Sequence, residues 1–247
     1  MTAALKVKTQ SHFSKAASQY QSHAKVQALS SDILLSRIGD SHLGTCLDLG
    51  AGPGVNTGVL AAQSDNYIAL DLSQQMLTRI DANAHKICAD MDMLPVQSNV
   101  IDTVFSNFAM QWSDDFASAV EELYRVIKPS GRAYLAVVAS NSLVEIKQAF
   151  ATVGRSAINH FDSMHSMITG AQNVGFEVTW QQQSLLFDCF DTAQEALKSI
   201  GAIGASSTQN NQGSLTKSQY IQVLDALQNG SQSVKLSYNV AFMELTK

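Results

Sequence analysis

The chain has 247 residues, of which 45% are hydrophobic and only 15% are charged, and its net charge is −5. This length and this hydrophobic content predict one folded domain and exclude an intrinsically disordered chain. The acidic balance argues against a general nucleic-acid binder, which needs a basic face. No apolar run approaches the ~20 residues of a membrane span, and residues 1–10 lack the apolar core of a signal peptide. We therefore expect a cytoplasmic protein that binds neither nucleic acid nor membranes.

The predicted elements alternate between strands and helices in the first part of the chain. A helix is expected over 11–37, because small and apolar side chains recur there at helical spacing. Five strands are expected over 45–49, 67–70, 86–89, 101–106 and 132–139. Helices separate most of these strands, and this alternation predicts an α/β fold with a doubly wound parallel sheet.

Beyond residue 140 the pattern predicts a helical insertion after the fifth strand and then two closing strands. Helices are expected over 143–150, 164–173, 193–200 and 217–227, and the closing strands are expected to begin at 175 and 237. The polar segment 201–213 predicts a mobile loop. Cys46 and Cys88 lie in apolar runs, so both are expected to be buried thiols. The spacing of the cysteines and histidines predicts no metal site.

A glycine-rich loop with the sequence G-A-G-P-G over 50–54 directly follows the first strand, which ends with L-D-L. Glycine allows positive φ and close approach of a ligand, and ligands of open α/β sheets bind at the carboxyl ends of the strands. We therefore expect Gly50, Gly52 and Gly54 to contact a ligand. The dinucleotide fingerprint G-x-G-x-x-G needs a sixth-position glycine, where this chain has Val55. The spacing G-x-G-x-G instead favours a ligand without a pyrophosphate at the helix N-terminus.

Two aspartates end the next two strands. Asp71 comes 21 residues after Gly50, where a carboxylate accepts hydrogen bonds from both ribose hydroxyls; Leu72 beside it is expected to contact the same ligand. Asp90 is placed to accept from an adenine amino group, and Met91 to cover the ring. The alternative is that both aspartates only cap helices. Three signals at the ends of three successive strands favour an adenosine-containing ligand.

The order of these motifs resembles the class I S-adenosylmethionine (SAM) dependent methyltransferases over residues 45–139. The resemblance implies SAM as the cofactor and a Rossmann-like, mostly parallel seven-stranded sheet. It also suggests two roles for Asp48, which precedes the glycine loop. A buried carboxylate is costly unless it is hydrogen-bonded, so Asp48 is expected either to hold the loop through backbone N–H groups or to reach the amino end of SAM through water.

A closer resemblance covers nearly the whole chain. The sequences F-S-K-A-A-S-Q-Y over 13–20 and S-N-F-A-M-Q-W over 106–112 are similar to the malonyl-[acyl-carrier protein] O-methyltransferases of biotin synthesis. This resemblance implies a single domain in three parts: an N-terminal helical lid (1–40), the SAM-binding core (45–139), and the substrate-side helices with the closing strands (140–247). His160 stands where the family often has Arg, Lys198 replaces a usual Arg, and Gly201 replaces a usual Lys. The changes at 160 and 201 leave the substrate side with less positive charge.

The implied reaction is esterification of the free carboxylate of a malonyl thioester. With a pKa near ~4, such a carboxylate is already ionised at neutral pH and needs no general base. Alignment of the reactants alone supplies about 7–11 kcal/mol. The side chains expected to align them are Tyr20, Asn107, Gln111, Trp112, Arg155 and His160, and Asn107 is also expected to contact SAM. The alternative roles of these side chains are core packing, loop packing or surface solvation.

The implied partner is acyl carrier protein bearing a malonyl group, or else malonyl-coenzyme A. Since acyl carrier proteins are strongly acidic, docking would require a local basic patch on this acidic chain. The candidates for the patch are Arg125, Lys128, Lys147, Arg155, Lys198 and Lys217. Two other functions stay open: a methyltransferase for another small carboxylic acid or a quinol-type metabolite, and a SAM-binding protein without catalysis.

Overall fold

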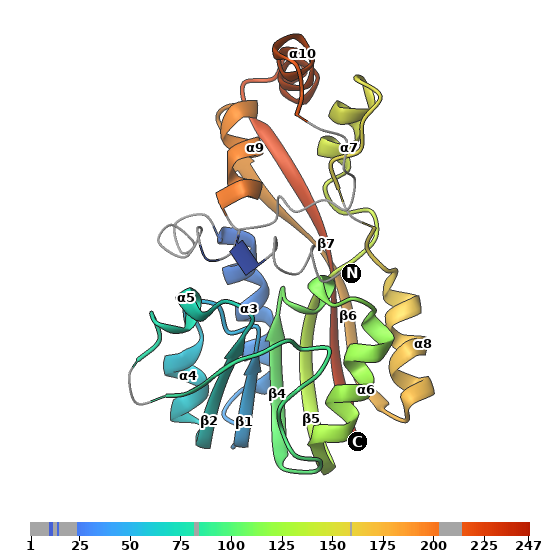
Figure 1. Ribbon diagram of the computed structural model, residues 1–247. Helices are drawn as coiled ribbons and strands as arrows, with labels where there is room; N and C mark the ends of the chain where they lie inside the picture. Colours follow the sequence, from blue (N-terminus) through green and yellow to red (C-terminus); the bar gives the residue numbers. More distant parts are fainter. Residues whose placement is uncertain (1–9, 12–13, 15–23, 82–83, 159, 203–213) are drawn as a thin grey trace.

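The computed structural model describes residues 10–11, 14, 24–81, 84–158, 160–202 and 214–247. One seven-stranded sheet with the order β3-β2-β1-β4-β5-β7-β6 forms the centre (Figure 1). The first five strands are parallel, whereas β7 runs antiparallel to both β5 and β6. The strand bounds are β1 Gly44–Leu49, β2 Ser64–Asp71, β3 His85–Cys88, β4 Ile101–Asn107, β5 Ile127–Val138, β6 Glu177–Phe190 and β7 Val234–Thr246. The predicted Rossmann-like, mostly parallel seven-stranded sheet is confirmed.

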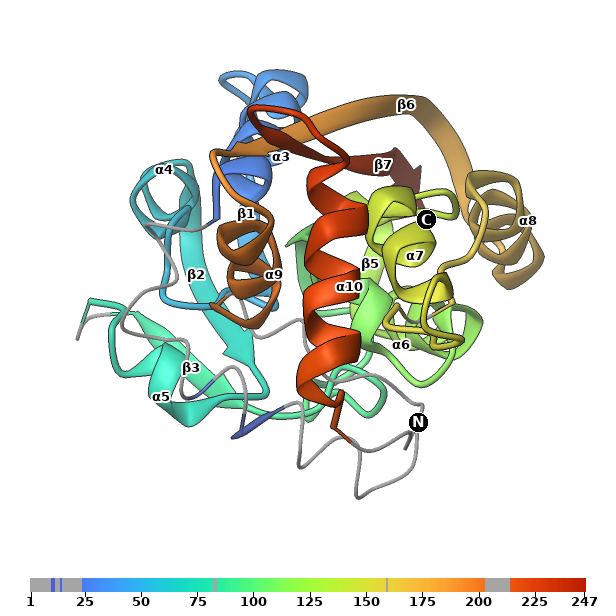
Figure 2. The same cartoon turned by 90° about the horizontal axis from the view of Figure 1, so that it is seen from above.

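Helices cover both faces of this sheet and one of its ends. Two helices, α3 (Lys25–Ile38) and α4 (Thr57–Ala62), pack on one face, and α6 (Phe116–Val126) and α8 (Met164–Val174) pack on the other. The remaining helices are α5 Gln74–Leu77, α7 Val144–Ala151, α9 Ala193–Ala202, α10 Lys217–Gln228 and the short 3₁₀ helix η1 Met110–Trp112. Three of them, α7, α9 and α10, lie together beyond the carboxyl ends of the parallel strands (Figures 1 and 2).

Hydrophobic periodicity explains how these elements pack. Along α6, Phe116, Ala119, Val120 and Leu123 recur at i, i+3, i+4 and i+7 and are all buried. The helix begins where the Asp115 side chain accepts a hydrogen bond from the Ser118 N–H at 3.0 Å. The strand β1 is buried on both faces, as is typical of a central parallel strand.

The last two strands are longer than the sequence predicts. The pairing of β5 with β7 ends at Val138 and Val240, but β6 continues to pair with β7 as far as Val234. The extra length forms a two-stranded arm that rises past the sheet and carries α9 and α10 (Figure 1). Two helices of the predicted insertion, α9 and α10, are therefore attached to the extended ends of β6 and β7.

Three local predictions are wrong. The helix expected over 11–37 is interrupted at Ala24, which has the non-helical angles φ −95° and ψ 43°, so α3 begins at Lys25. The expected loop 201–213 is wrong for residues 201–202, which end α9, and residues 203–213 lie outside the described residues. Cys88 is exposed because β3 is an edge strand, whereas Cys46 is buried and its pKa is raised by burial to about 12. No helix in the described part of the chain is long and apolar enough to cross a membrane.

Candidate functional site

The sheet topology brings the predicted ligand-binding residues to one edge. Strands β3, β2, β1 and β4 are neighbours and parallel, so their carboxyl ends lie side by side. Gly50 follows β1, Asp71 ends β2, Asp90 lies two residues after β3, and Asn107 ends β4. This edge is where open α/β sheets bind their ligands.

The glycine loop is attached to the end of β2. The backbone N–H groups of Gly50 and Ala51 both donate to the Leu70 carbonyl, at 2.8 and 3.0 Å. Gly50 has a φ of 74°, and a Cβ atom there would lie 2.2 Å from the Ala109 Cβ. Gly52 has a φ of 55°, but a Cβ atom there would meet nothing within 4 Å. Gly50 is therefore required by packing against the segment after β4, whereas Gly52 leaves open space for a ligand.

Asp71 connects this loop to the segment that follows β2. One carboxylate oxygen accepts the Gly52 N–H at 2.9 Å, and the other accepts the Ser73 N–H at 2.7 Å. Burial raises the pKa of Asp71, and these two N–H groups act in the opposite direction. Ser73, not Asp71, is the N-cap of α5, so Asp71 is not a simple helix cap. Each oxygen keeps a further lone pair for a ligand hydroxyl.

Asp90 also differs from a simple helix cap. Its carboxylate accepts the N–H of Asp92, two residues later, at 3.1 Å, which is a local turn contact. Residues 89–100 contain no helix or strand. Asp90 and Met91 are half-buried at the start of this connection, which leads from β3 to β4.

Asp48 lies beneath the glycine loop and is buried, with only 2% of its surface exposed. Its carboxylate accepts the Tyr67 hydroxyl at 2.7 Å, and that hydroxyl is 2.9 Å from the Thr57 hydroxyl. Burial raises the pKa of Asp48 to about 7, although the Tyr67 hydrogen bond lowers it, and the charge of Asp71 raises it further. The expected bonds from loop N–H groups are absent among the described residues, because the Tyr67 side chain fills that role. The water-mediated contact with a ligand stays a prediction.

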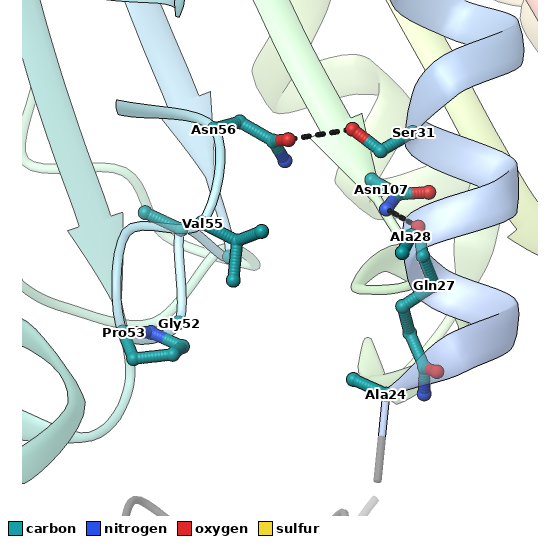
Figure 3. A pocket seen from close by; sticks show the side chains of 11 residues that line it. Ala24, Gln27, Ala28, Ser31, Gly52, Pro53, Val55, Asn56 and Asn107 are labelled. Atoms are coloured by element: carbon teal, nitrogen blue, oxygen red, sulfur yellow. Dashed lines mark hydrogen bonds between the residues drawn. The ribbon is translucent and has the colours of Figure 1, made fainter. Parts of the chain in front are cut away.

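Helix α3 forms the wall opposite the glycine loop (Figure 3). The Asn107 side chain accepts from the Ser30 hydroxyl at 2.7 Å and donates to the Gln27 carbonyl at 2.8 Å. Ser31, which follows Ser30 on α3, donates through its hydroxyl to the Asn56 side chain at 2.6 Å. This bond crosses from α3 to the loop 50–56. These contacts enclose a pocket of about 220 Å³ between α3, the loop 50–56 and Asn107. The Asn107 amide is thus engaged with α3, so its first role is to hold this wall.

The N-terminal segment touches the same edge. The Gln10 side chain donates to the Leu72 carbonyl at 2.8 Å, and the Ser14 hydroxyl is 2.9 Å from that of Ser73. Gln10 and Ser14 therefore contact the segment beside Asp71, and the role of the N-terminal segment as a lid stays a prediction. Tyr20 lies outside the described residues, and its role stays a prediction.

The segment after β4 carries Gln111 and Trp112. Phe108 is buried with a φ of 55°, a backbone conformation that is unusual for a bulky residue and often marks functional sites. The Gln111 side chain donates to the Phe108 carbonyl at 2.8 Å, and its own buried carbonyl oxygen has no partner among the described residues. The Phe108 ring lies 6.3 Å from that of Tyr238 on β7. Asn107, Gln111 and Trp112 thus belong to one short segment at the edge of the sheet.

Arg155 and His160 lie farther along the chain, between α7 and α8. Arg155 donates to the Ser214 carbonyl at 3.4 Å, which links the end of α7 to the segment before α10. His160 is exposed. No contact that the structure describes joins either residue to Asn107, so their substrate roles stay predictions. Within the described ranges, no group of three histidine, cysteine or acidic side chains could hold a metal ion.

Sequence reasoning missed the polar contacts of α3. Ser30 and Ser31 are almost fully buried on a helix whose other buried residues are apolar. Adjacent serines on the apolar face of a predicted helix indicate that this face meets polar groups. The helical spacing of Ser30 and Ser31 relative to Val26 and Leu34 would have placed the two serines on the buried face. The partners, Asn107 and Asn56, lie on other elements, and local sequence patterns do not identify them.

Comparison with known proteins shows which family has this arrangement. A family model described as a methyltransferase domain matches residues 47–135. The chain is 36% identical over 197 residues to the malonyl-[acyl-carrier protein] O-methyltransferase of Enterobacter lignolyticus (strain SCF1), covering 77% of each protein. It is 31% identical over 235 residues to the protein of the same name from Buchnera aphidicola subsp. Baizongia pistaciae, covering 93% of this chain and 94% of that protein.

Solved structures agree on the fold. The YcgJ protein of Bacillus subtilis matches with a TM-score of 0.63 at 15% identity, covering 89% of this chain and 98% of that one. An S-adenosylmethionine dependent methyltransferase from Mesorhizobium loti matches with a TM-score of 0.53 at 14% identity, covering 87% and 96%. At these identities the similarity establishes the fold alone.

The glycine loop generates a prediction about stability. Alanine at either position 50 or 52 must adopt a positive φ, which costs roughly 1–2 kcal/mol. Only Gly50→Ala also collides with Ala109, and overpacking of this kind adds about 1–3 kcal/mol. Urea unfolding should therefore show a clearly larger loss for Gly50→Ala than for Gly52→Ala. Equal losses would show that the Ala109 contact does not constrain the loop.

Asp48 generates a prediction about pH. Its folded pKa of about 7 lies above the ordinary 3.8, so the folded protein keeps a proton that the unfolded chain releases between these values. The free energy of unfolding should therefore fall as pH rises from 4 to 7, and Asp48→Asn should remove this contribution. Between pH 5 and 8, wild type should lose about 2–4 kcal/mol relative to the variant in urea unfolding. The exposed Asp32→Asn is the control, and an identical pH dependence in wild type and Asp48→Asn would contradict the burial effect.

Proposed function

This chain belongs to the malonyl-[acyl-carrier protein] O-methyltransferase family and is a SAM-dependent methyltransferase, and on that premise we propose that it methylates the free carboxylate of a malonyl thioester held on acyl carrier protein. The product would be the methyl ester used in biotin precursor synthesis. The observation that carries the proposal is the match to relatives of that name, one of which covers 93% of the chain, including the helices beyond the SAM-binding core.

The edge of the sheet suits SAM in shape and charge. Gly52 leaves room for a ligand, and Asp71 at the end of β2 and Asp90 after β3 provide acidic groups that complement a cation. We assign the ribose hydroxyls to Asp71, and the adenine to the neighbourhood of Leu72, Asp90 and Met91. The pocket beside α3, at about 220 Å³, is smaller than the ~300–1,000 Å³ that encloses a drug-sized ligand. It suits the methionyl arm alone.

The reaction requires the protein to align the carboxylate with the methyl group of SAM, and it does not require acid–base catalysis. When bound, SAM supplies a methyl group on a sulfonium. The group that the protein would hold in line with this methyl group is a carboxylate oxygen of the substrate. Since the carboxylate is already ionised at neutral pH, no proton has to move.

The side chains of the protein would position the acceptor and exclude water. Asn107 keeps α3 against the end of β4, and Gln111 braces the Phe108 turn. Trp112 is half-buried at the end of η1 and would shield the reacting atoms from water. Alignment of this kind supplies about 7–11 kcal/mol.

A basic face near the site would receive the acyl carrier. Lys147 lies on α7, Arg155 follows it, Lys198 lies on α9, and Lys217 begins α10. The three helices that carry the lysines lie together beyond the carboxyl edge of the sheet (Figures 1 and 2). The three lysines are exposed. We propose that this helical cap docks the acidic carrier.

Two of the six candidates do not belong to this face. Arg125 pairs with Glu122 at 2.7 Å, and Lys128 pairs with Asp102 at 2.8 Å. Both residues lie near the junction of α6 and β5, which is the end of the sheet opposite the cap. Arg125 lies just before β5 and Lys128 lies at its amino end, whereas the site lies at the carboxyl ends of the parallel strands. Both residues are therefore removed from the docking proposal.

Methyl transfer tests the proposal directly. With methyl-labelled SAM, the label should move to malonyl-acyl carrier protein and then be released as volatile methanol by mild alkali, because an ester is hydrolysed under those conditions. Label that survives alkali would contradict ester formation. Transfer only to another small acid or to a quinol would replace the substrate, and SAM binding without any transfer would indicate a non-catalytic protein.

Charge reversal tests the docking face. Lys147→Glu should slow turnover of the carrier-bound substrate several-fold at low salt, because electrostatic steering raises association rates about 10–10³-fold. Turnover of a small malonyl thioester should change little. Arg79→Glu makes the same charge change at an exposed position outside α7, α9 and α10, and it serves as the control. If both substrates respond equally to Lys147→Glu, the helical cap is not the docking face.

A further inference from the structure

The connection between β3 and β4 is held by α6, which packs on the face of the sheet opposite α3 and α4. This connection carries Asp90 and Met91 at its start and has no helix or strand of its own. Its local hydrogen bonds, from the N–H groups of Asp92 and Met93 to Asp90, reach only as far as residue 93. The remainder of the connection needs other partners to keep one conformation.

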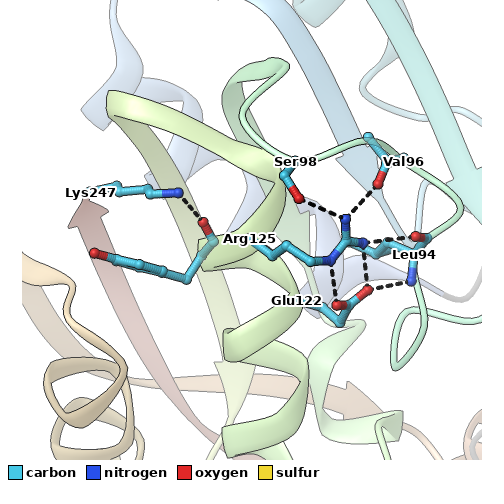
Figure 4. A network of polar contacts seen from close by, with 7 residues as sticks. Leu94, Val96, Ser98, Glu122, Arg125 and Lys247 are labelled. Carbon is cyan, nitrogen blue, oxygen red and sulfur yellow. Dashed lines mark hydrogen bonds and ion pairs between the residues drawn. The ribbon is translucent and has the colours of Figure 1, made fainter.

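Glu122 and Arg125 on α6 provide those partners (Figure 4). The Arg125 guanidinium donates to the carbonyls of Leu94 at 2.9 Å and Val96 at 2.7 Å. The Glu122 carboxylate accepts the N–H of Leu94 at 2.8 Å. The two side chains also bond each other twice, at 2.7 and 2.8 Å. We call this pair the α6 clamp, and it binds both polar backbone groups of Leu94.

This arrangement is stronger than an ordinary surface ion pair. Exposed pairs usually contribute little, but a planar guanidinium that forms two parallel bonds to a carboxylate has a defined geometry. The Leu94 side chain is only 4% exposed and lies in the same hydrophobic cluster as Met91. A second tie lies at the start of α6, where the Asp92 carboxylate accepts the Asp114 N–H at 2.9 Å. Helix α6 holds the connection at Leu94, and the segment just before that helix holds it at Asp92.

We propose that Glu122 and Arg125 are positioning residues that set the selectivity of the cofactor site for adenine by holding Asp90 in place. The inference rests on the proposed function, in which Asp90 accepts from the 6-amino group. A 6-oxo purine would place an acceptor against that carboxylate, so a fixed Asp90 rejects it. Sites built around such a hydrogen bond discriminate strongly against analogues that lack it. A loosened connection would let Asp90 turn away and would weaken this rejection.

The test compares two ligands that differ only at this position of the purine: S-adenosylhomocysteine and its inosine analogue. Their dissociation constants are measured by calorimetry for wild type, Arg125→Lys and Glu122→Gln. Arg125→Lys keeps the charge but loses the fork geometry, and Glu122→Gln is the milder change if Arg125→Lys folds poorly. The matched control is Lys128→Gln, which breaks the Asp102–Lys128 pair, also 2.8 Å long, away from the connection.

Wild type should prefer the adenine ligand by at least about tenfold, and each clamp variant should reduce this ratio by about fivefold or more, with the ratio of Lys128→Gln unchanged. An unchanged ratio in both clamp variants, or an equal loss of affinity for both ligands, would overturn the positioning role and leave the proposed function intact. If wild type itself does not distinguish the ligands, the adenine contact of Asp90 fails together with the clamp.

Discussion

The attachment of the glycine loop to β2 is the contact on which the rest of the site depends. Two consecutive N–H groups, those of Gly50 and Ala51, donate to the single Leu70 carbonyl. The chain can make this turn only with positive φ at Gly50, where the Ala109 methyl group leaves no room for a side chain. The turn places the Gly52 N–H against Asp71, so the conformation of the loop and the position of the acidic residue are determined together.

The segments that form the site are then held from both faces of the sheet. On one face, buried hydroxyls of α3 hold Asn107 and Asn56, and the pocket lies between those contacts. On the other face, the α6 clamp holds the connection that follows Asp90. A buried polar group without a hydrogen-bond partner costs free energy. Each of these contacts therefore favours this one arrangement of helix and loop over others that would leave the groups unpaired. The site therefore depends on helices that contribute few residues to the ligand-binding loops themselves.

The arm formed by β6 and β7 places the helical cap. Because β7 extends six residues beyond its last pairing with β5, α9 and α10 stand clear of the sheet and face its carboxyl edge. Phe108 and Tyr238 meet where the arm leaves the sheet. The helices of the cap carry the exposed Lys147, Lys198 and Lys217 together with Glu145, Glu195 and Asp225.

Local patterns in the sequence determined the strands, most of the helices, the glycine loop and the acidic residues at the strand ends. These features follow from periodicity and backbone conformation, which act over a few residues. Only the tertiary structure decided that Asp48 bonds Tyr67, that Asn107 serves α3, and that Arg125 and Lys128 are ion-paired away from the cap. It also decided that Cys88 is exposed, because an apolar run does not reveal whether its strand lies at the edge of the sheet. In each case the partners are distant in sequence or belong to different elements, and their contact depends on strand order and helix packing rather than on local spacing.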